Sequence, residues 1–195
     1  MKYTINLKDN KLELTQIITL IQLKDSKAEK ALFLRFAPKV LTICRRYASQ
    51  NVEAQDYMQE CFILIFTKIH QFNPNKGSFE GWLHRVCTNR ILELMRKSST
   101  QVKISFPEHL PEPELTKKDL VAIPQNVILN AIQQLPSGYR EVFNLYIFEG
   151  WSHRQIGKQL NIAETTSRSQ LTRAKKLLQH LLSKKNYNRY ERQLA

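Results

Sequence analysis

A stretch from Ser98 to Gln125 divides the chain, because it holds four of the seven prolines and shows no helical periodicity. Proline lacks a backbone N–H and clashes with the preceding helical turn, so prolines at this density cannot lie inside helices. Ser, Thr, Glu and Lys fill the positions between them, a composition typical of a linker. We therefore predict a first domain over residues 1–97, a flexible Pro-containing linker over 98–125, a second domain over 126–185 and a basic tail over 186–195.

Both flanking blocks have the composition of helices. The chain of 195 residues has 5 glycines, and Leu, Lys, Gln, Glu, Arg and Ala dominate its periodic stretches. This favours an all-α protein made of two small helical domains. The formal net charge of +13 indicates a partner with a phosphate backbone or an anionic surface, although a merely soluble basic protein has the same charge.

The three cysteines, Cys44, Cys61 and Cys87, are far apart in sequence and form no C-x-x-C pair. We expect reduced core thiols rather than a disulfide framework or a zinc site. His84 precedes Cys87 by three residues, but a second pair of ligands is missing, so no metal site is predicted.

No motif indicates an enzyme, a cofactor or a small-molecule substrate, since a Gly-rich phosphate loop and a nucleophile elbow are both missing. The first residues do not resemble a signal peptide, and no apolar run is long enough to cross a bilayer. We therefore expect a cytoplasmic protein.

Apolar positions at spacings of three and four predict four helices in the first block. Pro38 is placed at the first turn of the second helix, where its missing N–H is tolerated. The expected ranges are Ser26 to Phe36, Pro38 to Ala48, Ala54 to His70 and, after Ser78 as N-cap, the segment up to Lys97. The expected exposed positions of the fourth helix are His84, Arg85, Thr88, Asn89, Arg96 and Lys97.

The second block has the outline of a helix-turn-helix. A short helix near Val127 and a helix from Pro136 to Phe148, ended by Gly150, come first. A capping box, a left-handed turn and a longer helix follow, at Ser152 and Gln155, at Asn161 and at Glu164 to Leu182.

The longer helix carries basic and hydroxyl side chains away from its apolar stripe, at Arg168, Ser169, Thr172, Arg173 and Lys176. An arginine there can bind guanine O6 and N7 with both arms or clamp a phosphate. The helix N-terminus adds free N–H groups for phosphate. The alternative is a helical hairpin whose solvated face is basic.

A second candidate surface lies on the fourth helix, where Arg85, Asn89 and Arg96 share a face. The preceding loop adds polar side chains at Asn73, Asn75 and Lys76. A polar loop beside a basic helix can bind separated bases and their backbone. The alternative is that the arginines are solvated and the neighbouring Phe79 and Trp82 belong to the core.

The third helix begins with an acidic, polar edge made of Asp56, Gln59 and Glu60. Acids in the first turns stabilise the helix dipole, or they form a surface that docks a protein. The residues by themselves favour the first interpretation.

Several segments, in order, resemble regions of bacterial RNA polymerase sigma factors of the extracytoplasmic-function (ECF) group. D-Y-M-Q-E-C-F at 56–62 and F-E-G-W-L-H-R-V at 79–86, with Asn89 after it, are similar to D-x-x-Q-E-x-F and F-x-x-W-L-x-R-I-x-x-N of region two. Leu135-Pro136, residues 140–143, Glu149-Gly150, Ser152 and Gln155-Ile156 look like region four, and residues 166–175 are similar to its recognition helix. The resemblance covers about residues 25–182, and the absence of other sigma regions points to the ECF group.

The resemblance implies a role for each candidate. The polymerase-binding residues would be Asp56, Gln59 and Glu60, facing the clamp helices of the largest subunit, with the polymerase flap as a further contact. The residues on the melted minus-ten strand would be Asn73, Asn75, Lys76, Ser78, Arg85 and Asn89. The minus-thirty-five contacts would be Arg168, Ser169, Thr172, Arg173 and Lys175. The linker would follow the polymerase's RNA path, and an anti-sigma factor would be the regulator.

Three positions depart from the family's pattern. Thr165 stands where the family usually has Gly, Ala163 replaces a better N-cap residue, and Asn161 replaces the frequent turn Gly. A missing cap costs about 1 kcal/mol, so the start of the recognition helix is expected to fray without DNA.

Two other functions fit parts of the sequence. One is a helix-turn-helix repressor or activator whose first block dimerises or binds a ligand, and the other is a basic RNA-binding or ribosome-associated protein. The first block discriminates among them, since its acidic edge and basic helix fit polymerase docking and strand binding.

Overall fold

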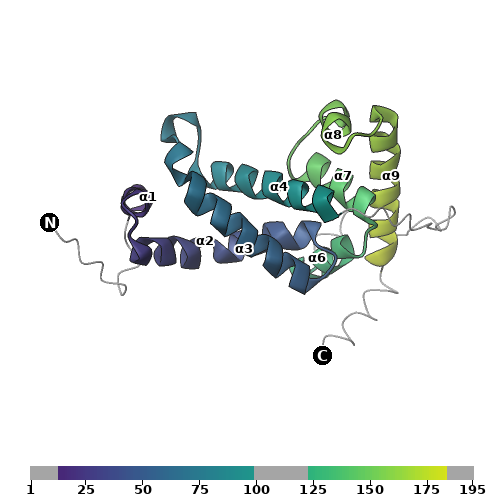
Figure 1. The fold of residues 1–195 in the computed structure, drawn as a ribbon. Helices are drawn as coiled ribbons and strands as arrows, with labels where there is room; N and C mark the ends of the chain where they lie inside the picture. The colour runs from purple at the N-terminus through teal and green to yellow at the C-terminus, as the bar shows by residue number, and fades with distance from the viewer. Residues whose placement is uncertain (1–12, 99–122, 184–195) are drawn as a thin grey trace. The chain divides into compact units, whose positions relative to one another are not determined.

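The computed structural model of the protein describes residues 13–98 and 123–183 (Figure 1). Every regular element in these two ranges is a helix, which confirms the predicted all-α class. Most of the predicted linker and the basic tail lie outside the described residues. The chain forms two compact units: unit 1 comprises Met1–Cys44 and Asn51–Thr100, and unit 2 comprises Arg45–Gln50 and Gln101–Ala195.

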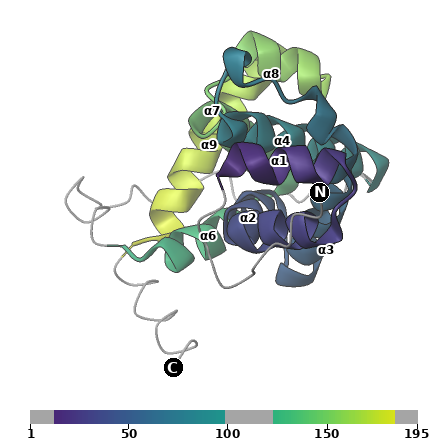
Figure 2. The same ribbon diagram turned by 90° about the vertical axis from the view of Figure 1, so that its left-hand side faces the viewer.

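Unit 1 is a group of packed helices (Figure 2), and the side chains buried between them are mostly apolar. Its elements are α1 (Leu14–Gln22), α2 (Ser26–Tyr47) as far as Cys44, α3 (Asn51–Lys68), η1 (Ile69–Gln71), η2 (Pro74–Lys76) and α4 (Phe79–Ser98). Helix α1 was not predicted, although it buries Ile17, Ile18 and Ile21 on one face. The largest fully buried side chains of unit 1 include Leu32, Val40, Ile65, Leu83, Ile91 and Leu92.

The predicted break before Pro38 is wrong, because α2 continues through this proline. The carbonyl that loses its N–H partner belongs to Leu34, whose side chain is 61% exposed, so that side of the helix faces water. Phe36 and Val40 are buried on the opposite side and hold both halves of α2 against the core. The Thr42 hydroxyl donates to the Pro38 carbonyl at 2.9 Å. Tertiary packing therefore outweighs the local cost of a proline.

Thr88 was expected on the exposed face of α4, but it is 2% exposed. It directly follows buried Cys87 and lies one turn before buried Ile91 and Leu92. The buried face of α4 is therefore wider than the apolar residues alone indicated. Arg85, Asn89, Arg96 and Lys97 are exposed as predicted.

Unit 2 contains α6 (Gln125–Gln133), α7 (Ser137–Ile147), α8 (His153–Leu160) and α9 (Glu164–Leu181). The capping box of Ser152 and Gln155 is present at the start of α8, and Asn161 has the left-handed conformation with φ 55°. Gly150 also has a positive φ, 68°. These three local predictions are confirmed.

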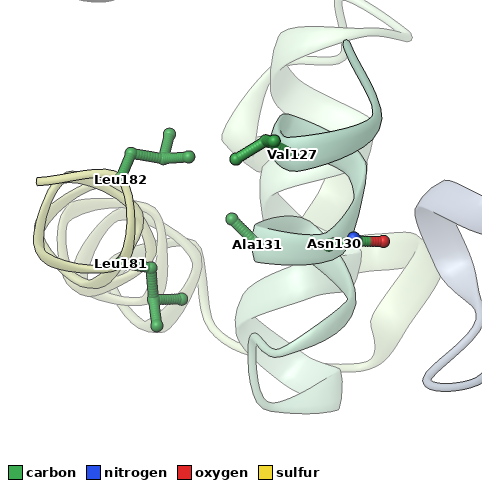
Figure 3. Close-up of a pocket in the computed structure, with 5 residues that line it drawn as sticks. All are labelled: Val127, Asn130, Ala131, Leu181 and Leu182. Carbon is green, nitrogen blue, oxygen red and sulfur yellow. The ribbon is translucent and has the colours of Figure 1, made fainter. Parts of the chain in front are cut away.

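The core of unit 2 brings α6 against the end of α9, with Val127 and Ala131 facing Leu181 and Leu182 (Figure 3). The groove between them has no interior space for a water molecule, so it is a packing seam rather than a ligand site. Arg140, 5% exposed, closes the C-terminal end of α6 by donating to the Gln133 carbonyl at 2.7 Å and to the Leu135 carbonyl at 3.2 Å. A charged donor thus satisfies carbonyls that the helix end leaves unpaired.

The turn between α8 and α9 depends on Gly157. A Cβ atom at this position would lie 2.7 Å from the backbone carbonyl oxygen of Ile162, closer than packed atoms approach. The Ile162 amide in turn donates to the Gly157 carbonyl at 3.0 Å. The two helices therefore meet backbone to backbone, and this contact sets the direction of α9.

Candidate nucleic-acid and protein interfaces

Helix α9 presents one continuous polar surface. Its buried side is made by Ser167, Leu171, Ala174, Leu177 and Leu178, which fixes the rotation of the helix about its axis. The predicted contact residues all lie on the remaining, exposed side: Arg168, Ser169, Thr172, Arg173 and Lys175. As expected, no side chain caps the helix at Ala163.

Internal contacts change what these side chains can offer a ligand. Arg168 pairs with Glu164, one turn earlier, at 2.5 Å. The Ser169 hydroxyl donates to the Thr166 carbonyl at 2.9 Å, and the Thr172 hydroxyl donates to the Arg168 carbonyl at 3.1 Å. Both hydroxyls keep acceptor lone pairs, so they suit amino groups on base edges better than phosphate oxygens.

A stack of side chains joins α7, α8 and α9 beside this surface. Lys175 Nζ lies 5.9 Å from the centre of the Tyr146 ring, and that ring stacks on His153 at 4.7 Å and 21°. His153 Nδ1 is 2.9 Å from the Ser167 hydroxyl. Burial lowers the pKa of His153, and the positive charges of Arg168 and Lys175 lower it further. Sequence analysis did not single out Tyr146 or His153, because their roles depend on contacts between helices.

The polar loop before α4 is exposed at each predicted position: Asn73, Asn75, Lys76 and Ser78. The Asn73 side chain accepts a hydrogen bond from the Asn75 amide at 2.9 Å, and the Ser78 hydroxyl accepts one from the Gly81 amide at 3.2 Å. Local bonds therefore shape the loop and begin the helix.

Aromatic rings attach the loop to α4. The Phe72 ring lies 5.2 Å from that of Phe79 and 5.9 Å from that of Trp82. Phe79 is buried, whereas Phe72 and Trp82 are half-buried. Arg85 and Asn89 follow Trp82 by about one and two helical turns and are exposed. The Phe72 ring thus holds the loop against the first turn of α4, and Arg85 and Asn89 follow along the same helix.

The acidic edge of α3 is not uniform. Asp56 and Gln59 are exposed, but Glu60 is half-buried and forms an ion pair with Arg90 of α4. Arg90 also pairs with Glu93 at 2.9 Å, and Glu93 pairs with Lys97 at 3.0 Å. Hydrogen bonds from Arg90 to Glu60 and Glu93 raise the pKa of Arg90. Glu60 therefore has a structural partner that sequence analysis did not predict.

No group of three or more His, Cys, Asp or Glu in residues 13–98 and 123–183 is placed to hold a metal ion. Among the helices in those ranges, none combines the length and apolarity that a membrane span requires.

Two family models match the chain, one on each helical block. The model described as Sigma-70 region 2 matches residues 32–101. The model described as Sigma-70, region 4 matches residues 125–178. The two matches follow the order of units 1 and 2.

Proteins and a solved structure with similarity to this chain are named as sigma factors. The ECF RNA polymerase sigma factor SigE of Mycolicibacterium smegmatis is 32% identical over 157 residues, which are 76% of this chain and 59% of that relative. The ECF RNA polymerase sigma factor RpoE of Cereibacter sphaeroides is 27% identical over 164 residues, which are 81% of this chain and 88% of that protein. A solved structure of the sigma factor RpoE with the anti-sigma factor NepR from Bartonella quintana has 22% identity and a TM-score of 0.45, and covers 78% of this chain and 95% of that one.

Proposed function

Because the chain belongs to the sigma-70 family of RNA polymerase sigma factors, in its ECF group, we propose that it binds core RNA polymerase and directs promoter-specific initiation of transcription. The observation that carries this proposal is the order of the two family matches on two helical units. A sigma factor of this kind needs one unit for the polymerase and the opened strand and another for upstream duplex DNA. The chain then supplies no chemistry of its own, because the polymerase holds the reacting groups.

Core polymerase would dock on the acidic edge of α3. Asp56 and Gln59 are exposed and carry charge and hydrogen-bonding capacity on an otherwise basic protein. Charge complementarity of this kind sets the orientation and rate of association more than raw affinity. Glu60 would contribute less directly, since Arg90 already holds its carboxylate. The proposed partner surface is the clamp helices of the largest polymerase subunit, with the flap as a contact for unit 2.

The opened minus-ten strand would bind along the loop before α4 and the exposed face of that helix. Asn73, Asn75, Lys76 and Ser78 offer hydrogen bonds and one positive charge. Asn89 can pair with a base edge, while Arg85 is suited to the backbone. The half-buried rings of Phe72 and Trp82 flank the loop, and aromatic faces stack on bases whatever their sequence. Asn89→Ala should relax base preference, whereas Arg85→Ala should weaken binding to many sequences alike.

The minus-thirty-five element would lie against α9, whose exposed side carries Arg168, Ser169, Thr172, Arg173 and Lys175. An α-helix fits the major groove, where arginine distinguishes guanine by two hydrogen bonds. Arg168 and Arg173 are five residues apart and so point in different directions around the helix. One of them can reach base edges while the other neutralises a phosphate.

This function implies a cytoplasmic protein, because promoter DNA and core polymerase lie in that compartment. An anti-sigma factor is the expected regulator, as the family resemblance implies. A helix-turn-helix regulator remains the alternative for unit 2 alone, but it gives no reason for the region 2 match on unit 1.

The decisive experiment is capture of core RNA polymerase followed by transcription from a matched promoter. We expect the purified chain to bind core polymerase and to start transcription at promoters that core polymerase alone ignores. A chain that binds duplex DNA yet neither binds core polymerase nor restores initiation is a regulator of another kind. Preference for RNA over promoter DNA would instead support the RNA-binding alternative.

A further inference from the structure

The chain's three cysteines, far apart in sequence, meet in the core of unit 1. Cys44 lies on α2, Cys61 on α3 and Cys87 on α4, and all three are 0% exposed. None of them is in a disulfide. The Cys61 thiol is hydrogen-bonded with the thiols of both Cys44 and Cys87, and it also donates to the Cys87 carbonyl at 3.8 Å. Cys61 is therefore the central member of a row of three sulfur atoms.

Neighbouring thiols and a guanidinium favour the ionised form of Cys61, whereas the bond that its thiol donates to the Cys87 carbonyl favours the protonated form. Hydrogen bonds from Cys44 and then Cys87 lower the pKa of Cys61 to about 5, against the opposing effect of burial. The Arg90 guanidinium lowers this pKa further, and the Glu60 carboxylate raises it. The thiolate is the nucleophilic form of cysteine.

We propose that this row of sulfurs is a redox-active dithiol site, in which a hydroperoxide oxidises Cys61 and a neighbouring thiol closes an intramolecular disulfide. Cys44 is the preferred second partner, because its hydrogen bond to Cys61 has the larger effect of the two. Cys87 is the substitute when Cys44 is absent. A small peroxide reaches the core through local opening of the helices, which folded proteins undergo continually.

The reaction balances in two steps. The Cys61 sulfur attacks one peroxide oxygen and breaks the O–O bond, which gives a sulfenic acid and releases an alcohol, or water from hydrogen peroxide, that takes up the thiol proton. The second thiol then attacks the sulfenic sulfur, and the leaving hydroxide takes up that thiol's proton as water. Two thiols are oxidised by two electrons, and one peroxide is reduced.

The location of the site gives oxidation a structural consequence. A disulfide brings two sulfurs to about 2.05 Å, much closer than hydrogen-bonded thiols. Because protein cores are close-packed, we expect this movement to shift α3 against α2. Helix α3 carries Asp56, Gln59 and Glu60, and Glu60 is paired with Arg90 beside the sulfurs. On the proposed function, the oxidised protein should bind core polymerase several-fold more weakly.

The test is treatment of the native full-length protein with hydrogen peroxide, followed by intact mass measurement and mapping of disulfide-linked peptides. We expect a loss of about 2 Da, that is two hydrogens, a Cys44–Cys61 linkage, and full reversal by dithiothreitol. Cys61→Ala should abolish the linkage. Cys87→Ala, the matched control, should retain it, and Cys44→Ala should move it to Cys61–Cys87.

Absence of the linkage from the wild-type protein overturns the proposal, as does a product that contains only intermolecular disulfides or irreversible sulfinic acid. A linkage that persists in Cys61→Ala also overturns it. Mapping on the wild-type chain keeps the test valid if a variant fails to fold. Unchanged core-polymerase binding by the mapped, oxidised protein would remove the consequence for docking, so the redox site and the proposed function are judged separately.

Discussion

The two units place their candidate functional residues in different ways. In unit 2 the five proposed duplex contacts lie on one helix, and a buried stripe on the same helix turns them all outward. In unit 1 the candidates come from α3, the loop and α4, and Arg90 of α4 holds Glu60 of α3. Local periodicity is therefore enough to specify the surface of unit 2. In unit 1 the availability of a side chain depends on partners far away in sequence.

The largest expected effect concerns the turn that sets the direction of α9 in unit 2. Gly157→Ala should lower the free energy of unfolding of unit 2 by about 3 kcal/mol, because the added Cβ collides with the Ile162 carbonyl. Gly138→Ala is the control, since its nearest neighbour is the flexible end of Gln170 at 3.2 Å, and alanine favours a helix. Urea unfolding should be followed by Trp151 fluorescence in a Trp82→Phe background. Equal destabilisation by both substitutions would contradict a backbone contact as the cause.

The next prediction concerns the arginines of α9. Arg173→Ala should weaken binding to a minus-thirty-five duplex by about 2 kcal/mol. The loss should appear as reduced sequence preference if Arg173 contacts a base, and as reduced salt dependence if it contacts a phosphate. Arg168→Ala should cost less, about 1 kcal/mol, because wild-type Arg168 must first give up its pair with Glu164. The Arg168→Ala effect should grow in a Glu164→Gln background. Titration on matched and scrambled duplexes at several salt concentrations separates base reading from phosphate contact, and two unaffected affinities would exclude α9 as a DNA reader.

Charge reversals on α3 distinguish a residue that contacts core polymerase from one that stabilises the packing of α3 on α4. Asp56→Lys should weaken core-polymerase binding by about 1–2 kcal/mol without changing stability, because Asp56 is exposed. Glu60→Arg should weaken binding and also lower stability by up to about 1 kcal/mol, since it breaks the ion pair with Arg90.

The double exchange Glu60→Arg with Arg90→Glu is made in a Glu93→Gln background, because Glu93 pairs with Arg90 and would repel a glutamate at position 90. It should restore the pair between α3 and α4, and with it the stability lost by Glu60→Arg in the same background. If it also restores polymerase binding, Glu60 acts by holding α3 and α4 together. If binding stays weak, its carboxylate contacts the polymerase directly. Parallel measurement of thermal unfolding and polymerase capture distinguishes these results.

The smallest effect is a pH dependence confined to unit 2. The pKa of His153 is lower in the folded protein than its ordinary value, so the unfolded state takes up the proton first. The contribution to stability is present above about pH 6.5 and is lost as the pH falls through the folded pKa. His153→Phe keeps an aromatic ring beside Tyr146 but cannot titrate. Its unfolding free energy should therefore fall less between pH 7 and pH 5 than that of the wild type, and equal slopes would exclude His153 as the source.

Features encoded within a few residues could be predicted from sequence. The capping box of Ser152 and Gln155 and the left-handed turn at Asn161 each depend on local backbone geometry, and both were predicted. The exposed side of α9 followed from the period of its apolar residues. The break before Pro38 was predicted from equally local rules and was wrong, because the buried Phe36 and Val40 hold the helix together across it.

The sequence by itself determined the helical class, the two blocks and the family, since helix propensity, prolines and motif order are properties of neighbouring residues. Only the tertiary structure decided that Glu60 is paired, that Tyr146 and His153 lie beside the proposed DNA surface, and that the three cysteines lie together in the core of unit 1. The physical reason is that side-chain contacts between helices depend on the rotation and depth at which the helices pack. That packing depends on all the buried residues jointly, so no single segment of the sequence encodes it.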